Sequence, residues 1–450
     1  MSRVLVANRG EIAVRVIRAC QALGLESVVA VSDADRDTLA ARMATRAVCI
    51  GPARPAESYL KVEAIIAAAL GTRCDAVHPG YGFLAEHPGI VEACEKHGLT
   101  FIGPRLESVR EMGNKLLARK IAASHGIPVV PGSQKVQALD GALRAAEELG
   151  FPILIKAAGG GGGRGMKIVS DPGDLRHALE TGAAEARIAF GDEALYIERY
   201  VANARHIEVQ VLGDKFGNVV HLGERDCSLQ RRYQKVIEES PAYSITQALR
   251  ERICETAATL ARKMEYENAG TVEFLVDQDT GAFYFLEMNT RIQVEHPVTE
   301  MVTGIDLVKE QIRVADGRRL GFTQGEVRFS GHAIECRINA ESARHGFRPS
   351  PGPMIEWSPP EGPGVRVDTH CFPGYLVPPF YDSLLAKLLT HGASRQEAVE
   401  RMHQALATFR VTGVETNIPF LRYLLNQRGY ETGDVNTRWL EAQAEAFLTR

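Results

Sequence analysis

"GTVEFLVDQDTGAFYFLEMNTRIQVEHP", residues 270–297, carries the strongest fold signal in the chain. The runs "TVEFLV" and "AFYFLEMN" read as strands, and the turn residues "DQDTG" lie between them, which predicts a β-hairpin. In a hairpin centred on position 280, Glu273 and Glu287 face one another on neighbouring strands. We therefore expect two carboxylates nearly opposite each other, with mostly apolar residues at the alternate positions.

The expected carboxylate pair predicts a metal site. Like charges placed opposite one another repel, and each is costly to bury without a partner. A divalent cation removes this conflict, and Asn289 adds an amide oxygen on the same face as Glu287. The all-oxygen set of Glu273, Glu287 and Asn289 suits Mg²⁺ or Mn²⁺. The alternative is a solvated face on which the carboxylates never meet; the apolar alternate positions disfavour it.

Odd-numbered polar residues continue past the hairpin. If the chain stays extended, Glu287, Asn289, Arg291, Gln293 and Glu295 share one face. Arginine forms a fork for planar oxyanions, glutamine is an amide donor, and glutamate is a candidate base. Beside a metal–phosphate site, this row indicates a small anionic co-substrate that becomes phosphorylated. A purely structural row of ion pairs is the alternative.

"KAAGGGGGRGMKIV", residues 156–169, contains five consecutive glycines. Because each glycine costs roughly 0.5–1 kcal/mol inside regular structure, the run predicts a loop. Backbone N–H groups in such a loop can converge on phosphate, and Lys156 and Lys115 supply the cations that a polyphosphate needs. The loop is not a Walker A motif, since no G-x-x-x-x-G-K-[S/T] occurs here. A flexible surface hairpin is the alternative interpretation.

Two further segments carry polar groups on predicted strands. "RHIEVQV", residues 205–211, alternates, so that His206, Glu208 and Gln210 share one face. His206 contacts a ribose or caps the sheet edge, and the pattern favours neither. "RDCSLQRRYQK" brings several cations together, which favours either solvent exposure or convergence on anions; its residues are Arg225, Gln230, Arg231, Arg232 and Lys235, with Cys227 expected as a small buried side chain.

The N-terminal segment predicts a parallel, doubly wound sheet. "RVLVAN", a turn at Gly10, the helix "EIAVRVIRACQALG" and the strand "ESVVAVSD" form a βαβ unit, and strand–helix alternation continues to about residue 105. A dinucleotide-binding site is disfavoured because "NRGEIA" lacks G-x-G-x-x-G. We expect domains at 1–112, 113–203, 204–330 and 331–450, with short alternating strands dominating the third and strands preceding helices in the fourth.

Composition excludes several classes of protein. The chain has 450 residues, of which 45% are hydrophobic and 24% charged, and its formal net charge is −4. No overall basic field indicates nucleic-acid binding, and no apolar run approaches the length of a membrane span. Eight scattered cysteines form no zinc-site spacing and fit a reducing compartment. We expect a cytoplasmic protein without a signal peptide, nucleic-acid partner or membrane partner.

Taken together, these motifs resemble biotin carboxylase, a member of the ATP-grasp superfamily, over nearly the whole chain. "EMNTRIQVEHPVTE" and the order of the motifs are the most specific features. The motifs that carry the resemblance are "ANRGEIAVRVIRA", "HPGYGFLAE", "KAAGGGGGRGMKIV", "RHIEVQV", "ERDCSLQRRYQKVIEE", "FLEMNTRIQVEHPVTE", "HAIECRINAE", "PSPG" and "YDSLLAKL". The resemblance implies an ATP-grasp fold of mixed α/β and α+β class, with an N-terminal doubly wound domain, a small glycine-loop lid and a C-terminal mixed or antiparallel domain.

The resemblance also implies a reaction. ATP phosphorylates bicarbonate to carboxyphosphate, which breaks down to CO₂ and phosphate; that phosphate removes the N1′ proton of carrier-bound biotin, and the enolate attacks CO₂. It places the nucleotide at Lys115, Lys156, the 159–165 loop with Gly161, Gly162 and Gly163, Glu198 and Val201 (adenine, through the backbone), His206 (ribose) and Gln230. It places two Mg²⁺ or Mn²⁺ ions at Glu273, Glu287 and Asn289; bicarbonate at Lys235, Arg291, Gln293 and Val294; its deprotonation at Glu295; and the biotin enolate at Arg337.

Three positions depart from the family pattern. Tyr233, Arg199 and Ala204 stand where histidine, lysine and proline are common, and tyrosine cannot carry a histidine's positive charge. The chain shows no A-M-K-M-like biotinylation site, so we expect a separate subunit that works with a biotin carboxyl carrier protein and carboxyltransferase subunits, as a homodimer, in acetyl-CoA carboxylase (fatty acid biosynthesis) or a related carboxylase. Another ATP-grasp carboxylate ligase and a non-catalytic nucleotide-binding subunit are the alternatives.

Overall fold

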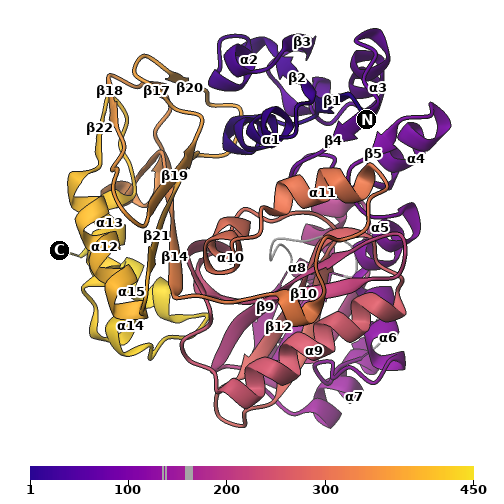
Figure 1. Ribbon diagram of the computed structural model, residues 1–450. Helices are drawn as coiled ribbons and strands as arrows, with labels where there is room; N and C mark the ends of the chain where they lie inside the picture. Colours follow the sequence, from indigo (N-terminus) through magenta and orange to yellow (C-terminus); the bar gives the residue numbers. More distant parts are fainter. Residues whose placement is uncertain (134–135, 137–138, 158–165, 450) are drawn as a thin grey trace.

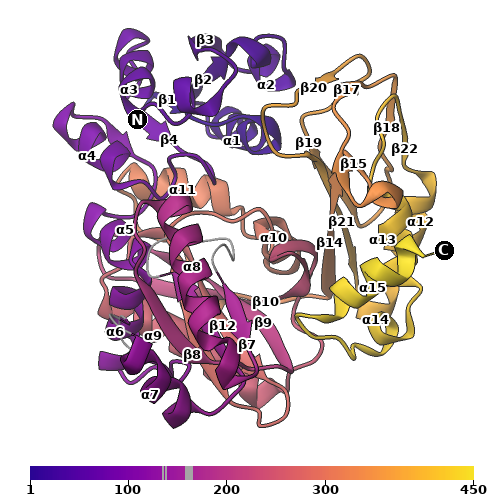
Figure 2. The same ribbon diagram turned by 180° about the vertical axis from the view of Figure 1, so that it is seen from behind.

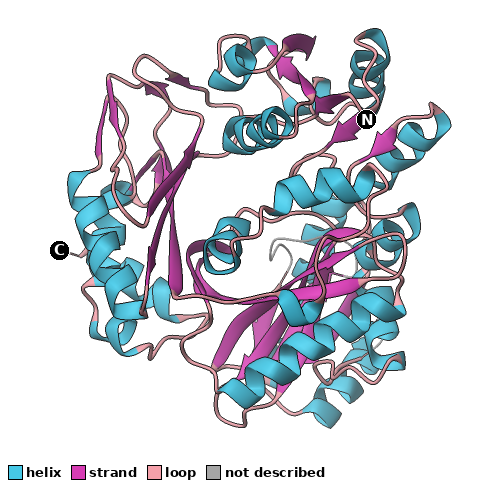
Figure 3. Cartoon of the chain, in the orientation of Figure 1, coloured by secondary structure: helices cyan, strands magenta, loops and turns pink. Residues whose placement is uncertain are grey.

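The computed structural model describes residues 1–133, 136, 139–157 and 166–449. Three groups of elements follow one another along the chain (Figure 1). The N-terminal elements lie at the upper right, the elements around a long sheet at the lower right, and the C-terminal elements at the left. Helices and strands are mixed in all three groups (Figure 3).

Five parallel strands in the order β3-β2-β1-β4-β5 form the N-terminal sheet. Helix α1 begins at Gly10, whose φ is +67°, and packs its apolar residues on one face of the sheet, while α3 and α4 cover the other. The doubly wound parallel sheet is therefore confirmed. The elements are β1 (Arg3–Val6), α1 (Gly10–Ala22), β2 (Glu26–Ser32), α2 (Leu39–Met43), β3 (Arg46–Gly51), α3 (Val62–Gly71), β4 (Ala76–His78), α4 (Pro88–Lys96), β5 (Thr100–Phe101) and α5 (Leu106–Gly113).

A small antiparallel sheet in the order β7-β6-β8 follows, and α8 covers it (Figure 2). Helix α8 was not expected, although Leu175, Leu179 and Ala183 recur with helical spacing and pack on this sheet. Val129, before this sheet, forms an isolated bridge with Phe285. The elements are α6 (Lys115–Ser124), α7 (Leu139–Leu149), β6 (Ile153–Ala157), β7 (Lys167–Val169), α8 (Leu175–Phe190) and β8 (Leu195–Arg199).

An eight-stranded sheet in the order β13-β12-β9-β10-β11-β14-β21-β19 is the centre of the molecule. The pairing of β11 with β14 extends it into the C-terminal group. The expectation of short strands after residue 204 is wrong: β9 and β10 have 10 and 13 residues. The strands are β9 (Ala204–Gly213), β10 (Val219–Arg231), β11 (Gln234–Ser240), β12 (Asn268–Asp277), β13 (Phe283–Asn289), β14 (His332–Asn339), β19 (Val365–Thr369) and β21 (Leu384–Gly392).

Three helices lie between these strands and position them. α9 (Gln247–Lys263) was also not expected, yet Ile253, Ala257 and Leu260 follow helical spacing, and the Thr246 side chain caps its first turn. It packs on β9 and β10. α10 (His296–Thr303) and α11 (Leu307–Ala315) follow β13. Because α10 contacts β10, β11, β14 and β21, it fixes the end of the segment before it, where Glu295 lies.

The C-terminal group contains the expected helices, α12 (Arg395–Thr408) and α13 (Ile418–Leu425), packed on β14 and β21 in one large apolar core. No helix within the described ranges is long and apolar enough to cross a membrane. All eight cysteines are free thiols. The remaining elements are α14 (Arg428–Thr432), α15 (Trp439–Leu448), β15 (Glu341–Ser342), β16 (Arg348–Pro349), β17 (Gly352–Pro353), β18 (Glu356–Ser358), β20 (Leu376–Val377) and β22 (Arg410–Thr412).

Candidate active site

The β12–β13 hairpin has the predicted register at its open end. Glu273 pairs with Glu287, and Thr271 pairs with Asn289. A bulge follows Glu273, so that Phe274 pairs with Phe285, one position away from the symmetric register. The two carboxylates are therefore cross-strand neighbours, and the bulge lies directly beside them.

The two carboxylates reach different partners. Glu273 is buried, and its Oε1 accepts hydrogen bonds from Nδ2 of Asn289 and Nε2 of Gln293, both at 3.0 Å. Oε2 of Glu287 lies 3.3 Å from Nζ of Lys115, the first residue of α6. Burial raises the pKa of Glu273, but the neighbouring cations outweigh it and hold that pKa well below the ordinary value. The ionised Glu273 carboxylate, with the oxygens of Glu287 and Asn289, makes an all-oxygen donor set that fits Mg²⁺ or Mn²⁺.

Lys235 is the charge at the centre of the site. Its Nζ lies 2.5 Å from Glu208, 3.0 Å from Glu273 and 2.6 Å from Glu295, and 3.3 Å from Oε1 of Gln293. Burial alone lowers a lysine pKa, but the three carboxylates raise that of Lys235 well above its ordinary value. Lys235 is consequently a permanent cation bound to three carboxylates from β9, β12 and the segment before α10.

Lys235 contacts Glu208, and Glu208 in turn contacts Arg225. Neither Glu208 nor Arg225 was predicted as a site residue from the sequence. Both are fully buried, and Nε of Arg225 donates to Oε1 of Glu208 at 2.6 Å. The other guanidinium nitrogens of Arg225 bond Gln210, Thr271 and Thr299. The alternation of "RHIEVQV" was the signal available for Glu208, since it places this residue on the face of His206.

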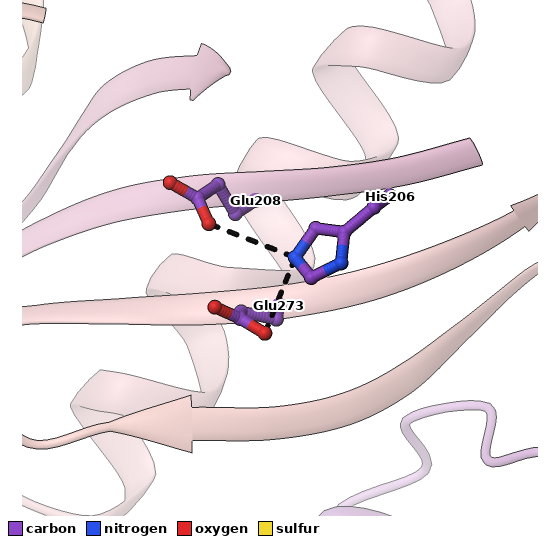
Figure 4. Close-up of side chains that lie close together, drawn as sticks. All are labelled: His206, Glu208 and Glu273. Atoms are coloured by element: carbon purple, nitrogen blue, oxygen red, sulfur yellow. Dashed lines mark ion pairs between the residues drawn. The ribbon is translucent and has the colours of Figure 1, made fainter. Parts of the chain in front are cut away.

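His206 lies in the middle of the sheet. β9 has β12 on one side and β10 on the other, so of the two roles left open for His206 the sheet-edge cap is excluded. Its Nε2 is 3.2 Å from Glu273 and 3.7 Å from Glu208, and the three side chains point toward one another (Figure 4). Burial lowers the pKa of His206, but Glu273 and Glu208 outweigh it and raise that pKa to about 9. Gln230 lies on the other ring nitrogen, Nδ1, at 3.0 Å.

The segment after β13 is not extended, which corrects the basis of the polar row. β13 ends at Asn289, residues 290–295 are irregular, and α10 begins at His296 with Pro297 in its first turn. The polar side chains do not all share one face: Gln293 and Glu295 reach Lys235, whereas Nε of Arg291 donates to Glu86 at 2.8 Å. Nη2 of Arg291 also donates to Oδ1 of Asn289 at 3.1 Å, so the Arg291 guanidinium still lies beside the expected metal ligands.

Glu295 contacts both Lys235 on β11 and Arg337 on β14. Its Oε1 accepts from Lys235 at 2.6 Å and its Oε2 from Arg337 at 2.9 Å. Burial raises its pKa, but Lys235 and Arg337 outweigh burial and hold that pKa below its ordinary value, so Glu295 is ionised and able to accept a proton. Arg337 also donates from Nε to Glu238 at 2.6 Å, and the carbonyl oxygen of Val294 accepts from Nζ of Lys387 at 2.9 Å.

Three of the nucleotide-binding residues expected from the sequence, Lys156, Glu198 and Val201, lie on or directly after the small β7-β6-β8 sheet. Nζ of Lys156, at the end of β6, lies 2.6 Å from Oε2 of Glu198 on β8, and Arg119 contacts the same carboxylate. Val201 is buried just after β8. Gly161, Gly162 and Gly163 lie outside the described residues. Lys156 and Lys115 have different ion-pair partners, Glu198 and Glu287, and share no side-chain partner among the described contacts.

The basic segment divides between core and surface. Arg225 and Lys235 converge on Glu208, whereas the guanidinium of Arg231 lies 3.9 Å from the centre of the Phe347 ring. Tyr233 is half exposed with φ +64° in the turn between β10 and β11. Both outcomes considered for this segment therefore occur. Of the other departures, Arg199 donates to the Tyr284 hydroxyl, Ala204 begins β9 in a buried position, and Cys227 is buried as expected.

Family models cover most of the chain. They are "Biotin carboxylase, N-terminal domain" at residues 1–109, "Carbamoyl-phosphate synthase L chain, ATP binding domain" at 114–323 and "Biotin carboxylase C-terminal domain" at 335–442. Biotin carboxylase 1 of Bacillus subtilis is 49% identical over 442 residues, which is 98% of each chain. The chain belongs to the biotin carboxylase family. It is an ATP-dependent ligase with the biotin carboxylase activity of a biotin-dependent carboxylase.

Solved biotin carboxylase structures share the whole fold. A biotin carboxylase–beta-gamma-ATP complex from Campylobacter jejuni matches with a TM-score of 0.96 and 45% identity over 98% of each chain. The biotin carboxylase domain dimer of Hydrogenobacter thermophilus 2-oxoglutarate carboxylase, in complex with MgADP, ADP and bicarbonate, matches with a TM-score of 0.95 and 45% identity over 99% of this chain and 98% of that chain. The predicted ATP-grasp fold class is confirmed.

Proposed function

We propose that this biotin carboxylase uses Glu295 as the base that prepares bicarbonate for phosphorylation by ATP. The observation that carries the proposal is the meeting of Lys235 and Arg337 on the two oxygens of one buried carboxylate, with Gln293 beside them. Two cations and an amide suit the binding of a small planar oxyanion, and a carboxylate among them suits removal of its proton. Arg291, Val294 and Gln293 complete the proposed bicarbonate site.

The reaction proposed for these residues is the one that the resemblance to biotin carboxylase implies. Glu295 takes the bicarbonate proton, a bicarbonate oxygen attacks the γ-phosphorus of ATP, and the bond to the ADP oxygen breaks. Carboxyphosphate then divides into CO₂ and phosphate, and phosphate takes the N1′ proton of biotin. The electron pair left on biotin attacks CO₂, and Arg337 stabilises the enolate oxygen through its fixed charge.

The nucleotide and metal roles are part of the same proposal. Lys115 and Lys156 bind the phosphates together with the glycine loop, Glu198 and Val201 meet adenine through the backbone, and His206 and Gln230 lie toward the ribose. Glu273, Glu287 and Asn289 would hold Mg²⁺ or Mn²⁺, and the ion would supply positive charge against the phosphates. The ionised state of Glu273 and its position opposite Glu287 support this role.

The proposed partners are a biotin carboxyl carrier protein and carboxyltransferase subunits, with a second copy of this chain. The dimer of the Hydrogenobacter thermophilus domain supports the homodimer. The partner transferase chooses the final acceptor, an acyl-CoA or a keto acid. Co-purification of a biotinylated carrier and transferase with this chain tests these partners.

Steady-state kinetics test the proposed function. ATP cleavage is expected to require bicarbonate and to be accelerated by free biotin, since biotin consumes the CO₂ formed. ATP cleavage that is indifferent to both compounds would overturn the proposal.

A further inference from the structure

Two buried carboxyl groups lie opposite one another behind Arg337. Glu238 on β11 pairs with Glu335 on β14, and both are fully buried. Directly opposite residues on antiparallel strands have Cβ atoms about 4.5–5.5 Å apart, so their side chains interact. Neither carboxyl group is used in the proposed reaction, and burying both as anions is strongly unfavourable.

The hydrogen bonds around this pair are incomplete. Glu238 accepts from Arg337 through Oε1, but its Oε2 has no hydrogen-bond partner among the described residues. Both oxygens of Glu335 are likewise without a partner there. Three buried acceptor oxygens on facing side chains therefore lack a donor, although buried polar groups are nearly always satisfied. One proton on Glu335 turns one of these oxygens into a donor for Oε2 of Glu238, so that two of the three gain a partner.

Neither neighbouring cation forms a hydrogen bond or ion pair with Glu335 among the described contacts. Arg337 binds Glu238 and Glu295, and Nζ of Lys387 donates to the carbonyl oxygen of Val294 and lies 3.1 Å from Glu11. Burial raises the pKa of both carboxyl groups of the pair; repulsion by Glu238 adds to this for Glu335, and repulsion by Glu295 adds to it for Glu238. The charged groups that act on Glu335 are Lys387 on β21, Glu238 on β11, Arg337 on β14 and Glu295 before α10. Lys387 in turn lies beside Glu11 on α1, Asp368 on β19 and His296 on α10.

We propose that Glu335 is a neutral carboxylic acid at neutral pH, that it donates its O–H to Oε2 of Glu238, and that this contact orients Glu238 on the guanidinium of Arg337. Glu335 is thus a positioning residue that acts through Glu238. The contact rests on the sheet register and the unpartnered oxygens; its effect on catalysis rests on the proposed role of Arg337.

The contact has a direct consequence for the biotin half of the reaction. When Glu335 keeps its proton, Glu238 holds Arg337 with one oxygen and accepts from Glu335 with the other. When Glu335 ionises, the two facing carboxylates repel, and the carboxylate that orients Arg337 is displaced. Biotin carboxylation then falls more than bicarbonate-dependent ATP cleavage without biotin, because only the former needs the enolate at Arg337.

Infrared spectroscopy tests the proton directly and needs no enzyme activity. Wild-type protein at neutral pH is expected to show a carbonyl-stretch band of a protonated carboxylic acid that is absent from Glu335→Gln. Glu356→Gln, a carboxyl-to-amide change at an exposed position of β18, is the matched control and retains the band. Absence of any band that depends on Glu335 would overturn the proposal, whatever the outcome of the kinetic tests of function.

Thermal unfolding supplies a second measurement. An acid with a raised folded-state pKa stabilises the fold less as the pH rises above its ordinary value, 4.5, whereas glutamine does not titrate. The melting temperature of Glu335→Gln relative to wild type is therefore expected to increase from about pH 5 to about pH 8. A difference that stays constant or decreases over this range would contradict a proton on Glu335.

Kinetics test the positioning role. Glu335→Gln keeps a donor and is expected to retain the wild-type ratio of biotin carboxylation to biotin-independent ATP cleavage within about twofold. Glu335→Ala removes the donor and lowers this ratio about tenfold. Equal ratios of biotin carboxylation to ATP cleavage in the two variants would overturn the positioning role. If Glu335→Ala does not fold, a ratio in Glu335→Gln that is tenfold below the wild-type ratio would also overturn it.

Discussion

Replacing Glu295 by glutamine removes one negative charge from the centre of the site and nearly preserves the side chain's shape. Glu295 is 2% exposed and is bound by Lys235 at 2.6 Å and Arg337 at 2.9 Å. A positioned base contributes about 10²–10⁴-fold to a rate, which corresponds to about 3–5 kcal/mol of activation free energy. We expect Glu295→Gln to lower bicarbonate-dependent ATP cleavage by about this factor.

The same substitution has a smaller effect on folding. Lys235 keeps Glu208 and Glu273 as partners, and Arg337 keeps Glu238. Hydrogen bonds to charged groups contribute about 1.5–3 kcal/mol against about 1 kcal/mol for neutral ones, so the free energy of unfolding falls by about 1–3 kcal/mol at neutral pH.

This loss of stability depends on pH in a known direction. The pKa of Glu295 is lowered in the folded protein, so its charge stabilises the fold above its ordinary pKa of 4.5. That stabilisation disappears as the pH falls through the lowered pKa. The difference in unfolding free energy between wild type and Glu295→Gln therefore shrinks in acid, and urea unfolding at several pH values measures it.

Two assays and one control variant separate the contributions. Calorimetry measures nucleotide binding, coupled kinetics measure ATP cleavage with and without bicarbonate, and Glu356→Gln serves as the exposed carboxyl-to-amide control. Nucleotide binding is expected to be spared in Glu295→Gln. A parallel loss of nucleotide binding and turnover, or bicarbonate-dependent turnover that survives the substitution, would refute the assignment of Glu295 as the base.

The remaining substitutions test the cations and the metal site. Arg337→Ala is expected to lower biotin carboxylation more than basal ATP cleavage, and proportional losses in the two rates would count against its role. Glu273→Gln raises the Mg²⁺ concentration for half-maximal ATP cleavage by about tenfold or more, and an unchanged Mg²⁺ dependence contradicts the metal assignment. Lys235→Met leaves Glu208, Glu273 and Glu295 without their shared cation and lowers the unfolding free energy by about 3–5 kcal/mol; a loss below about 1 kcal/mol in urea unfolding argues against it.

Local sequence patterns predicted the parts of the site that depend on neighbouring residues. Turn residues between two apolar runs placed Glu273 opposite Glu287, and period-two alternation placed His206 and Glu208 on one face of β9. The prediction that the polar residues share one face fails after Asn289, because the period of two holds only within the strand and β13 ends there. Pro297, in the first turn of α10, was the available sign that a helix begins there.

Contacts between distant segments were outside the reach of such patterns. Glu86 binds Arg291 across 205 positions, and Glu335 meets Glu238 only because β14 pairs with β11. No spacing in the sequence fixes which strands become neighbours in an eight-stranded sheet. Charged residues buried in pairs also read as surface residues when each is considered alone, and Arg225 is an example.

Isotope transfer from bicarbonate to phosphate tests the central claim most directly. If a bicarbonate oxygen attacks the γ-phosphorus of ATP, ¹⁸O-labelled bicarbonate delivers one labelled oxygen to each phosphate formed together with ADP. The label is expected in phosphate from wild type and at a much reduced rate from Glu295→Gln. Phosphate that takes its new oxygen only from water would contradict the account.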